Sequence, residues 1–185
     1  MKYKNVYLIT KNPGKHRSAE RVFDKYKIEL MMPQKDYIEI QASTSIEIAR
    51  YTALHATKDL QAPVIREDHS LYINCLGLPG PYTSFIEKKL SAEKLLKIMS
   101  AEKDRTGYFE IATVYAEPLG LVKEFVCRVP IHIKEKEIVK DPRNGWNGIL
   151  CLANEERAFT EYPEEERLDV WNKNFMNIAK FLSKS

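Results

Sequence analysis

The sequence predicts a mixed α/β (α+β) fold, in which helices cover a mixed β-sheet. Three observations lead to this prediction. A short apolar strand at 6–9 precedes a turn and a helix, apolar residues recur with helical spacing over 44–60, and two strand-like runs lie at 108–116 and 121–129. The short turn between those two runs predicts a hairpin, and hence at least one antiparallel pair of strands.

The N-terminal region has the pattern of a strand, a turn and a helix. Val6–Ile9 is continuously apolar, and the turn residues Asn12-Pro13-Gly14 follow it. The next apolar residues have helical spacing, and a second apolar run over 28–32 predicts a neighbouring strand. The segment 10–15 therefore lies where a strand ends and a helix begins.

The clearest helix is predicted over 44–60. Thr44 and Glu47 have the spacing of a capping box, in which each side chain satisfies a backbone N–H at the helix start. The apolar residues of this segment form one stripe, which we expect to face the sheet. The stripe contains Ile46, Ala49, Ala53, Ala56 and Leu60.

Further elements are predicted in the second half of the chain. One strand ends at Glu67 and Asp68, a turn follows at 77–80, and a short helix begins after Ser91. The last helix is predicted to begin after Pro163 with three glutamates, whose charge suits the positive end of a helix dipole. Its buried stripe is expected to contain Trp171, Phe175, Ile178 and Leu182.

Length and charge exclude several classes of protein. The 185 residues are expected to form a single domain, 1–185. Lys and Arg number 29 against 26 Asp and Glu, and the two signs are interleaved, so no nucleic-acid partner is expected. The longest apolar runs are about six residues, far short of the roughly 20 that span a bilayer, so no membrane span is expected.

Cysteine usage and the N-terminus indicate the compartment. Cys75, Cys127 and Cys151 are odd in number and widely spaced, which fits neither a disulfide framework nor a zinc site. The N-terminal residues lack the pattern of a signal peptide. We therefore expect a cytoplasmic protein with reduced thiols.

The segment Thr10–Lys15, here called the phosphate loop, is the first candidate site. Backbone N–H groups at a helix start favour an anion, and Lys15 adds a positive charge suited to phosphate. The glycine spacing of a Walker loop is absent. An ordinary turn with a solvated lysine is the alternative interpretation.

Three carboxylates, here called the acidic set, form the second candidate site: Glu39, Glu67 and Asp68. Magnesium prefers hard oxygen ligands together with substrate phosphates, so carboxylates near a lysine-bearing loop would suit phosphoanhydride chemistry. Adjacent strand residues point to opposite faces, so we expect only one of Glu67 and Asp68 to face the site. Surface carboxylates at a strand end are the alternative.

Ordered motifs along most of the chain resemble those of a known family. The motifs are Thr10-x-Asn12-x-x-Lys15, Glu39-Ile40-Gln41, Glu67-Asp68-His69-Ser70-Leu71, Pro79-Gly80-Pro81-Tyr82-Thr83, and Asp104-Arg105 followed by Tyr108-Phe109. Together they resemble the inosine triphosphate pyrophosphatase family of HAM type, enzymes that hydrolyse non-canonical purine nucleoside triphosphates.

The resemblance implies an elongated mixed β-sheet flanked by helices in two lobes, with a nucleotide cleft between them. It implies metal-dependent hydrolysis of a nucleoside triphosphate such as ITP, XTP or dITP to a nucleoside monophosphate and pyrophosphate. Magnesium is the implied metal, with manganese as an alternative. Members of the family are usually homodimers, so a homodimer is expected.

The resemblance also implies a role for each matched residue. Thr10, Asn12 and Lys15 would hold the triphosphate, and the acidic set would bind the metal. Asp68 would in addition activate the water that attacks the α-phosphorus, with Lys15 as the second catalytic residue. Phosphoryl chemistry of this kind depends mainly on positioning and charge neutralisation.

The base-reading motifs depart from the family pattern. The family's Gly-Phe-Gly-Tyr/Trp-Asp-Pro loop corresponds to 145–150, where Ile149 stands in place of the aspartate. The family's Ser-His-Arg falls on 171–173, and a family lysine that contacts phosphate falls on Thr52. We therefore expect a shifted base preference. The predicted base-binding residues are Trp146 for stacking and Asn147, Asn172 and Lys173 as donors.

Three other functions stay open. A catalytically weak or inactive nucleotide-binding protein of the same fold is the main alternative. A pyrophosphatase of the Maf type is a second, but its Ser-x-Ser-Pro-Arg-Arg loop does not match Thr10–Lys15. A partner protein that uses the fold as a scaffold is a third, and the sequence has no interaction helix or tail to support it.

Overall fold

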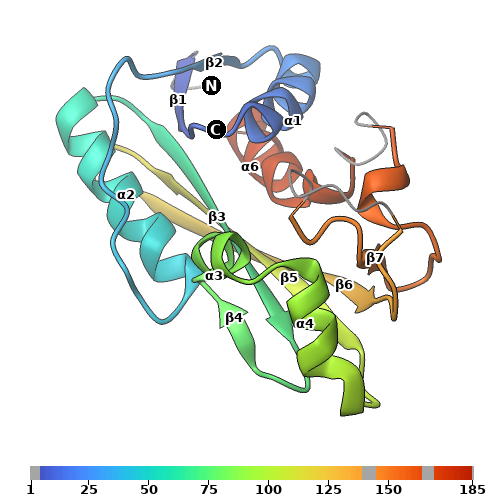
Figure 1. The fold of residues 1–185 in the computed structure, drawn as a ribbon. Coiled ribbons are helices and arrows are strands. Elements are labelled where there is room, and N and C mark those ends of the chain that lie inside the picture. The colour runs from blue at the N-terminus through green and yellow to red at the C-terminus, as the bar shows by residue number, and fades with distance from the viewer. Residues whose placement is uncertain (1–4, 139–144, 164–168, 185) are drawn as a thin grey trace. The chain divides into compact units, whose positions relative to one another are not determined.

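The computed structural model describes residues 5–138, 145–163 and 169–184. Within these residues, helices flank a seven-stranded mixed sheet, which confirms the predicted fold class (Figure 1). The strand order is β2-β1-β3-β5-β6-β7, and β4 pairs with β3. The strands are β1 (Asn5–Ile9), β2 (Glu29–Met31), β3 (Val64–Ile73), β4 (Leu78–Gly80), β5 (Thr106–Ala116), β6 (Val122–Ile133) and β7 (Leu150–Leu152).

The chain divides into two compact units. Unit 1 contains Met1–Asp68, Ile111–Cys127 and Leu168–Ser185, and unit 2 contains His69–Glu110 and Arg128–Arg167. Strands β3, β5 and β6 each contribute residues to both units. A single domain over 1–185 stays a prediction.

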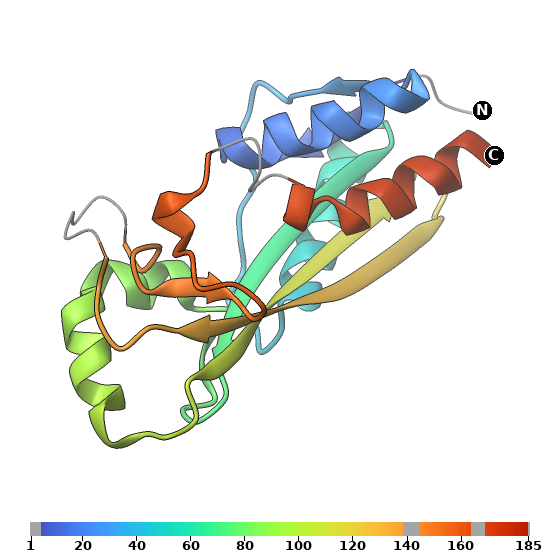
Figure 2. The same ribbon diagram turned by 90° about the vertical axis from the view of Figure 1, so that its right-hand side faces the viewer.

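Unit 1 holds the helices α1 (Pro13–Phe23), α2 (Ser45–Leu60) and α6 (Lys173–Lys184). Helices α1 and α6 lie side by side on one face of the strands, and α2 lies on the other (Figure 2). Two apolar clusters correspond to the two faces, because successive strand residues alternate in direction. The first contains Val6, Leu8, Ala19, Phe23, Ile65, Tyr115, Phe175 and Ile178, and the second contains Ile9, Ala49, Ala53, Ala56, Val64 and Val114.

The predicted start of α2 is confirmed in detail. Thr44 Oγ1 accepts a hydrogen bond from the Glu47 amide at 3.4 Å, and the Thr44 amide donates to Glu47 Oε2 at 3.1 Å. This is the capping box, which satisfies two backbone donors at once. The small residues of the helix then allow a close approach to the sheet.

Strand β1 pairs in parallel with both β2 and β3. Parallel neighbours need crossover connections, and α1 and α2 lie within these two connections. The register places Leu8 opposite Ile65 and Ile9 opposite Arg66. The phosphate loop therefore leaves β1 beside Arg66, the third residue of β3.

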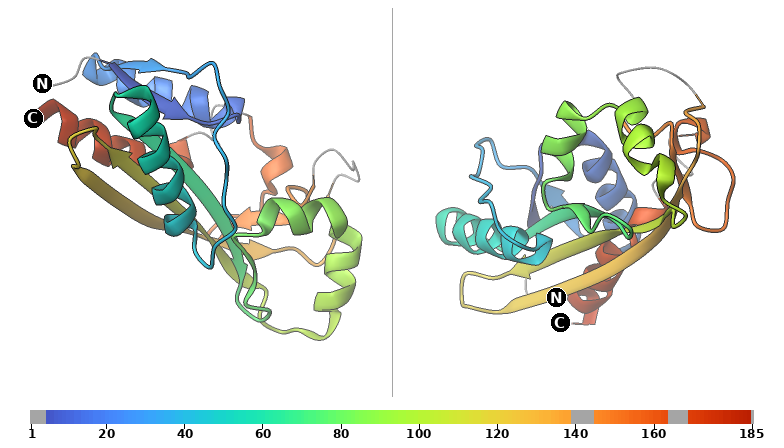
Figure 3. Two further views of the ribbon diagram at one scale, coloured as in Figure 1. Left: turned by 90° about the vertical axis from the view of Figure 1, so that its left-hand side faces the viewer. Right: turned by 60° about the horizontal axis from the view of Figure 1, so that its bottom comes forward.

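Unit 2 contains the helices α3 (Thr83–Lys89) and α4 (Ala92–Ile98), which follow β4 along the chain (Figure 3). The turn predicted over 77–80 is partly wrong, because Leu78–Gly80 forms a short strand on β3. Helix α3 was not predicted from the sequence. It buries none of its residues, so it has no periodic apolar stripe by which to recognise it.

The C-terminal helix differs from its prediction at the start. The predicted N-terminal residues 164–168 lie outside the described residues, and α6 begins at Lys173. Phe175, Ile178 and Leu182 are buried as predicted. Trp171 precedes α6 and is partly exposed, so its assignment to the buried stripe is wrong. No helix in the described part of the chain is long and apolar enough to span a membrane.

Candidate functional site

The phosphate loop is a turn fixed by its own side chains. Asn12 Oδ1 accepts from the amides of Gly14 at 2.8 Å and Lys15 at 3.3 Å, and so caps α1. Thr10 Oγ1 accepts from the Asn12 amide at 3.0 Å. Thr10 and Asn12 therefore shape the loop, and the Lys15 side chain supplies a positive charge beside Glu67.

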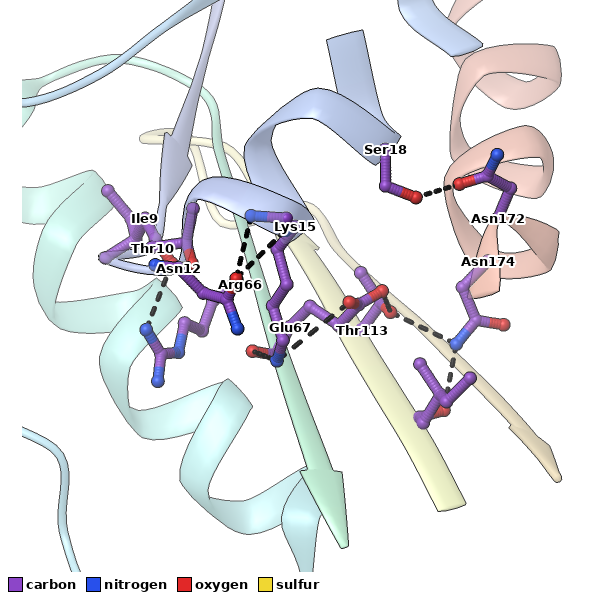
Figure 4. A network of polar contacts seen from close by, with 12 residues as sticks. Ile9, Thr10, Asn12, Lys15, Ser18, Arg66, Glu67, Thr113, Asn172 and Asn174 are labelled. Atoms are coloured by element: carbon purple, nitrogen blue, oxygen red, sulfur yellow. Dashed lines mark hydrogen bonds and ion pairs between the residues drawn. The ribbon is translucent and has the colours of Figure 1, made fainter. Parts of the chain in front are cut away.

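The Lys15 side chain reaches from α1 to β3. Its Nζ donates to the Glu67 carbonyl oxygen at 3.1 Å and lies 4.0 Å from Glu67 Oε1 (Figure 4). Burial lowers the pKa of Lys15 because it disfavours the ammonium form, and the Glu67 carboxylate opposes this shift. The structure thus brings together two of the predicted site residues.

Glu67 is held by a buried chain of polar side chains, here called the Glu67 network. Glu67 Oε2 accepts from Thr113 Oγ1 at 3.0 Å, and Thr113 Oγ1 accepts from Asn174 Nδ2 at 3.1 Å. Asn174 Nδ2 also donates to the carbonyls of Ile111 at 2.8 Å and Phe125 at 3.1 Å. Figure 4 shows this chain from α6 through β5 to β3. The network fixes the carboxylate that faces Lys15.

A second ion pair lies on the other face of β3. Arg66 Nη2 contacts Glu39 Oε1, and Arg66 Nη1 donates to the Ile9 carbonyl at 3.0 Å. Arg66 and Asp68 are two residues apart on the strand and share a face, whereas Glu67 between them points to the opposite one. The strand continues through both residues, so the expectation that only one of Glu67 and Asp68 faces the site stays a prediction from strand alternation.

Glu39 belongs to the connection between β2 and α2, here called the strap (32–43). The Tyr37 hydroxyl donates to Asp59 Oδ2 at 2.7 Å. Burial raises the pKa of Tyr37, and this hydrogen bond raises it further. Lys35 lies 2.5 Å from the same carboxylate. The buried Thr52 donates to the Ile38 carbonyl at 3.2 Å. The strap is therefore fastened to α2 by three contacts just before Glu39 in the chain.

The acidic set is not assembled as one cluster. Glu67 is bonded to Thr113 and contacts Lys15. In residues 5–138, 145–163 and 169–184, no three His, Cys, Asp or Glu side chains are placed to hold a metal ion. Glu39 and Asp68 offer hard carboxylate oxygens of the kind that magnesium prefers, and the Glu39 side chain is 60% exposed. The donor chemistry of Glu39 and Asp68 suits a divalent cation.

Two predicted base-binding residues belong to unit 2. Trp146 is 1% exposed, its indole Nε1 donates to the Leu90 carbonyl at 2.8 Å, and its amide donates to Glu87 Oε1 at 2.8 Å. The ring is thus part of the core of this unit. Asn147 is half-buried, and its carbonyl accepts from the Thr160 amide at 3.2 Å.

The other two predicted base-binding residues belong to unit 1. Asn172 is buried, its Oδ1 accepts from the Ser18 hydroxyl, and its Nδ2 donates to Asp169 at 3.4 Å. It therefore ties α1 to the start of α6 (Figure 4). Lys173 is the first residue of α6 and is exposed.

Three residues of the site were not predicted from the sequence: Arg66, Thr113 and Asn174. Arg66 follows the apolar pair Val64-Ile65 in a strand, and a charge in such a place was a usable signal. No sequence pattern marks Thr113 or Asn174 as a site residue. Their importance arises from contacts between residues that are 46 and 61 positions apart in the chain.

Known relatives match this chain over nearly all of its length. A dITP/XTP pyrophosphatase of Ignicoccus hospitalis is 34% identical over 190 aligned positions, which cover 97% of each chain. A dITP/XTP pyrophosphatase of Methanopyrus kandleri is 31% identical over 170 positions, which cover 89% of this chain and 88% of the relative.

Solved structures share the fold. The Ham1 protein of Staphylococcus aureus gives a TM-score of 0.80 at 22% identity and covers 98% of this chain and 99% of its own. A HAM1 protein of Coxiella burnetii gives 0.82 at 19% identity, with 99% and 100% covered. The Ham1 family model matches residues 6–174. The resemblance found in the sequence motifs is therefore confirmed, and the chain belongs to the Ham1 family.

Proposed function

We propose that this chain hydrolyses a non-canonical purine nucleoside triphosphate, such as ITP, XTP or dITP, to a nucleoside monophosphate and pyrophosphate. The relatives named dITP/XTP pyrophosphatases support the enzyme class, a nucleoside triphosphate pyrophosphohydrolase. The observation in the structure that carries the proposal is Lys15 at the end of the phosphate loop, held by Glu67 on β3.

Lys15 would bind and orient the triphosphate. Its ammonium is desolvated, so its attraction to a phosphate oxygen is stronger than that of a lysine in bulk water. Thr10 and Asn12 would act by fixing the loop that carries it. The Glu67 network would keep the lysine in one place when no substrate is bound.

Asp68 would accept a proton from the attacking water. The water oxygen forms a bond to the α-phosphorus while the bond to the bridging oxygen of the β-phosphate breaks, and pyrophosphate leaves. A divalent ion, magnesium or manganese, held by Glu39 and Asp68 would neutralise charge on the phosphate oxygens. Glu67, named in the acidic set, is proposed instead to position Lys15, because its carboxylate is already bonded to Thr113.

The base-binding residues are proposed to differ in role. Lys173 is exposed and charged and is the best candidate donor, with Asn147 second. Trp146 and Asn172 are buried and bonded within their own units, so we propose that they support the structure near the base. Homodimer formation and a cytoplasmic location stay predictions from the sequence.

A nucleotide-binding protein without turnover is the second candidate function. The observation that favours it is that two carboxylates of the acidic set are each paired with a cation, Glu67 with Lys15 and Glu39 with Arg66. Such pairs balance charge in the absence of a metal. A hydrolase must exchange at least one of these pairs for substrate or metal during the reaction.

Pyrophosphate release distinguishes the two functions. The wild-type chain is assayed with magnesium on ITP, XTP, dITP, the common nucleotides and modified pyrimidine triphosphates, beside Asp68→Asn. We expect turnover of a purine member and a loss of about 10³-fold in Asp68→Asn, the size typical of a general base. The matched control is Asp104→Asn, which removes a carboxylate that accepts from Thr106 in unit 2. No turnover with nucleotide binding intact by calorimetry would establish the binding protein.

A further inference from the structure

Arg66 is a buried cation whose partner is exposed. It is 6% exposed, whereas the Glu39 side chain that it contacts is 60% exposed. Its Nη1 donates to the Ile9 carbonyl at 3.0 Å. Its Nε is buried and has no acceptor among the described residues. The guanidinium is thus desolvated but only partly satisfied.

This arrangement contributes little to the stability of the fold. Burying a guanidinium is unfavourable unless its donors are satisfied, and an apolar side chain of similar length at the same place is often as stable or more so. Arg105 in unit 2 differs: its Nε, Nη1 and Nη2 all donate to backbone carbonyls. The stability of the fold alone therefore does not explain the incomplete bonding of Arg66.

The two bonds of Arg66 join two segments of the candidate site. The Ile9 carbonyl is the last of β1 and directly precedes the phosphate loop, as Figure 4 shows. Glu39 is the strap residue proposed to bind the metal. A planar guanidinium with donors in fixed directions can hold both oxygens at once, which an ammonium on a flexible stem does poorly.

We propose that Arg66 is a positioning residue, which holds the Glu39 carboxylate at a fixed place beside the phosphate loop. The inference rests on the proposed function, because it specifies how the metal ligand of that site is oriented. Removing Arg66 frees Glu39 into solvent and leaves no buried charge behind. Removing Glu39 has a different consequence, since it leaves Arg66 buried without its carboxylate.

The test compares Arg66→Met with Arg66→Lys. The matched control is Arg50→Met, which removes another arginine of unit 1 that ion-pairs with a glutamate, Glu124, outside the site. For Arg66→Met we expect a thermal midpoint within about 3 °C of wild type and kcat/KM lower by about 100-fold, as for a misplaced catalytic group. The magnesium concentration for half-maximal rate should rise about 10-fold, and Arg66→Lys should recover only part of each loss.

Hydrogen exchange of the peptide 36–41 gives a readout that does not need turnover. Faster exchange of this peptide in Arg66→Met, and not in Arg50→Met, supports the positioning role. Unchanged exchange together with unchanged kinetics overturns it. If wild type hydrolyses no nucleotide, the proposed function fails. The exchange experiment still shows whether Arg66 holds the strap in place.

A double substitution separates positioning from an independent contact. If Arg66 acts through Glu39, the variant Arg66→Met with Glu39→Gln should have the same kcat/KM as Glu39→Gln alone. If the two losses multiply, Arg66 acts on the substrate by itself and the proposal is wrong.

Discussion

Two donor side chains in each unit of the molecule are bonded in different ways. In unit 2, Trp146 and Arg105 donate to backbone carbonyls, at Leu90 for the indole and at Met99, Ile133 and Lys134 for the guanidinium. In unit 1, Lys15 and Arg66 each face a carboxylate as well as a backbone carbonyl.

This difference distinguishes side chains that stabilise the fold from side chains that can take part in binding or catalysis. A backbone carbonyl cannot leave its place without unfolding the local chain, so a donor bonded to it stabilises the fold. A carboxylate on a side chain can release its cation when a phosphate or a metal ion arrives. Unit 2 therefore resembles a scaffold at these residues, and unit 1 a site that can exchange partners.

The largest expected effect follows from removing the charge of Lys15 in unit 1. Lys15→Met keeps the length of the side chain but removes the charge that would face the phosphates, so kcat/KM should fall by about 10³-fold. Steady-state kinetics on the preferred triphosphate measure this. Lys11→Met is the matched control, because Lys11 is an exposed loop lysine paired with Asp36 at 2.7 Å. Equal kinetics in both variants would favour the interpretation of Lys15 as a merely structural lysine.

The next effect concerns the end of the Glu67 network. Asn174→Ala removes the buried donor that the Ile111 carbonyl, Thr113 Oγ1 and the Phe125 carbonyl share. The free energy of unfolding should fall by about 3 kcal/mol, which urea denaturation measures. Asn177→Ala, on the same helix but partly exposed, should change it by less than about 1 kcal/mol. A small loss in Asn174→Ala would mean that the network does not hold α6 to the sheet.

A smaller effect is expected in unit 2. Trp146→Phe retains an aromatic ring but loses the hydrogen bond to the Leu90 carbonyl, so stability should fall by about 1 to 2 kcal/mol. The ranking of triphosphates in the pyrophosphate assay should stay as in wild type. A changed ranking would show that Trp146 reads the base, as the sequence first predicted, and would weaken the contrast between the units.

The smallest effect concerns alkaline pH and applies to both units. Burial raises the pKa of Cys127 in unit 1 and of Cys151 in unit 2 above the ordinary value of 9.0. Each thiol therefore stays protonated in the folded chain at a pH where the unfolded chain has lost the proton, so stability falls as pH rises above 9. Between pH 8 and 10, each should contribute no more than about 1.4 kcal/mol. Cys127→Ala and Cys151→Ala should each flatten this fall in urea titrations, and an unchanged slope would contradict the prediction.

Local signals were sufficient for most of the fold. The capping box at Thr44 and the alanine stripe of α2 are complete within one segment, and both are found as predicted. The strand ending at Ile9 and the turn at Asn12 are equally local. Helix α3 was not predicted because none of its residues is buried, and its sequence therefore lacks a periodic apolar stripe.

The candidate site was only partly predictable. Ordered motifs pointed to Lys15, Glu39, Glu67 and Asp68, and the structure brings Lys15 and Glu67 together. The buried state of Trp146 was not foreseen, because a tryptophan in a glycine-rich turn has the same sequence pattern whether it stacks on a ligand or fills a core.

The sequence by itself determined the order of elements, the family and the residue types available for phosphate chemistry. Those properties depend on periodicity and on short motifs, which are local along the chain. Tertiary structure alone decided the partners: Glu67 with Thr113, and Arg66 with Glu39. The physical reason is that side-chain partners depend on the register of strands and on loop paths, which bring residues together across tens of positions and leave no local trace in the sequence.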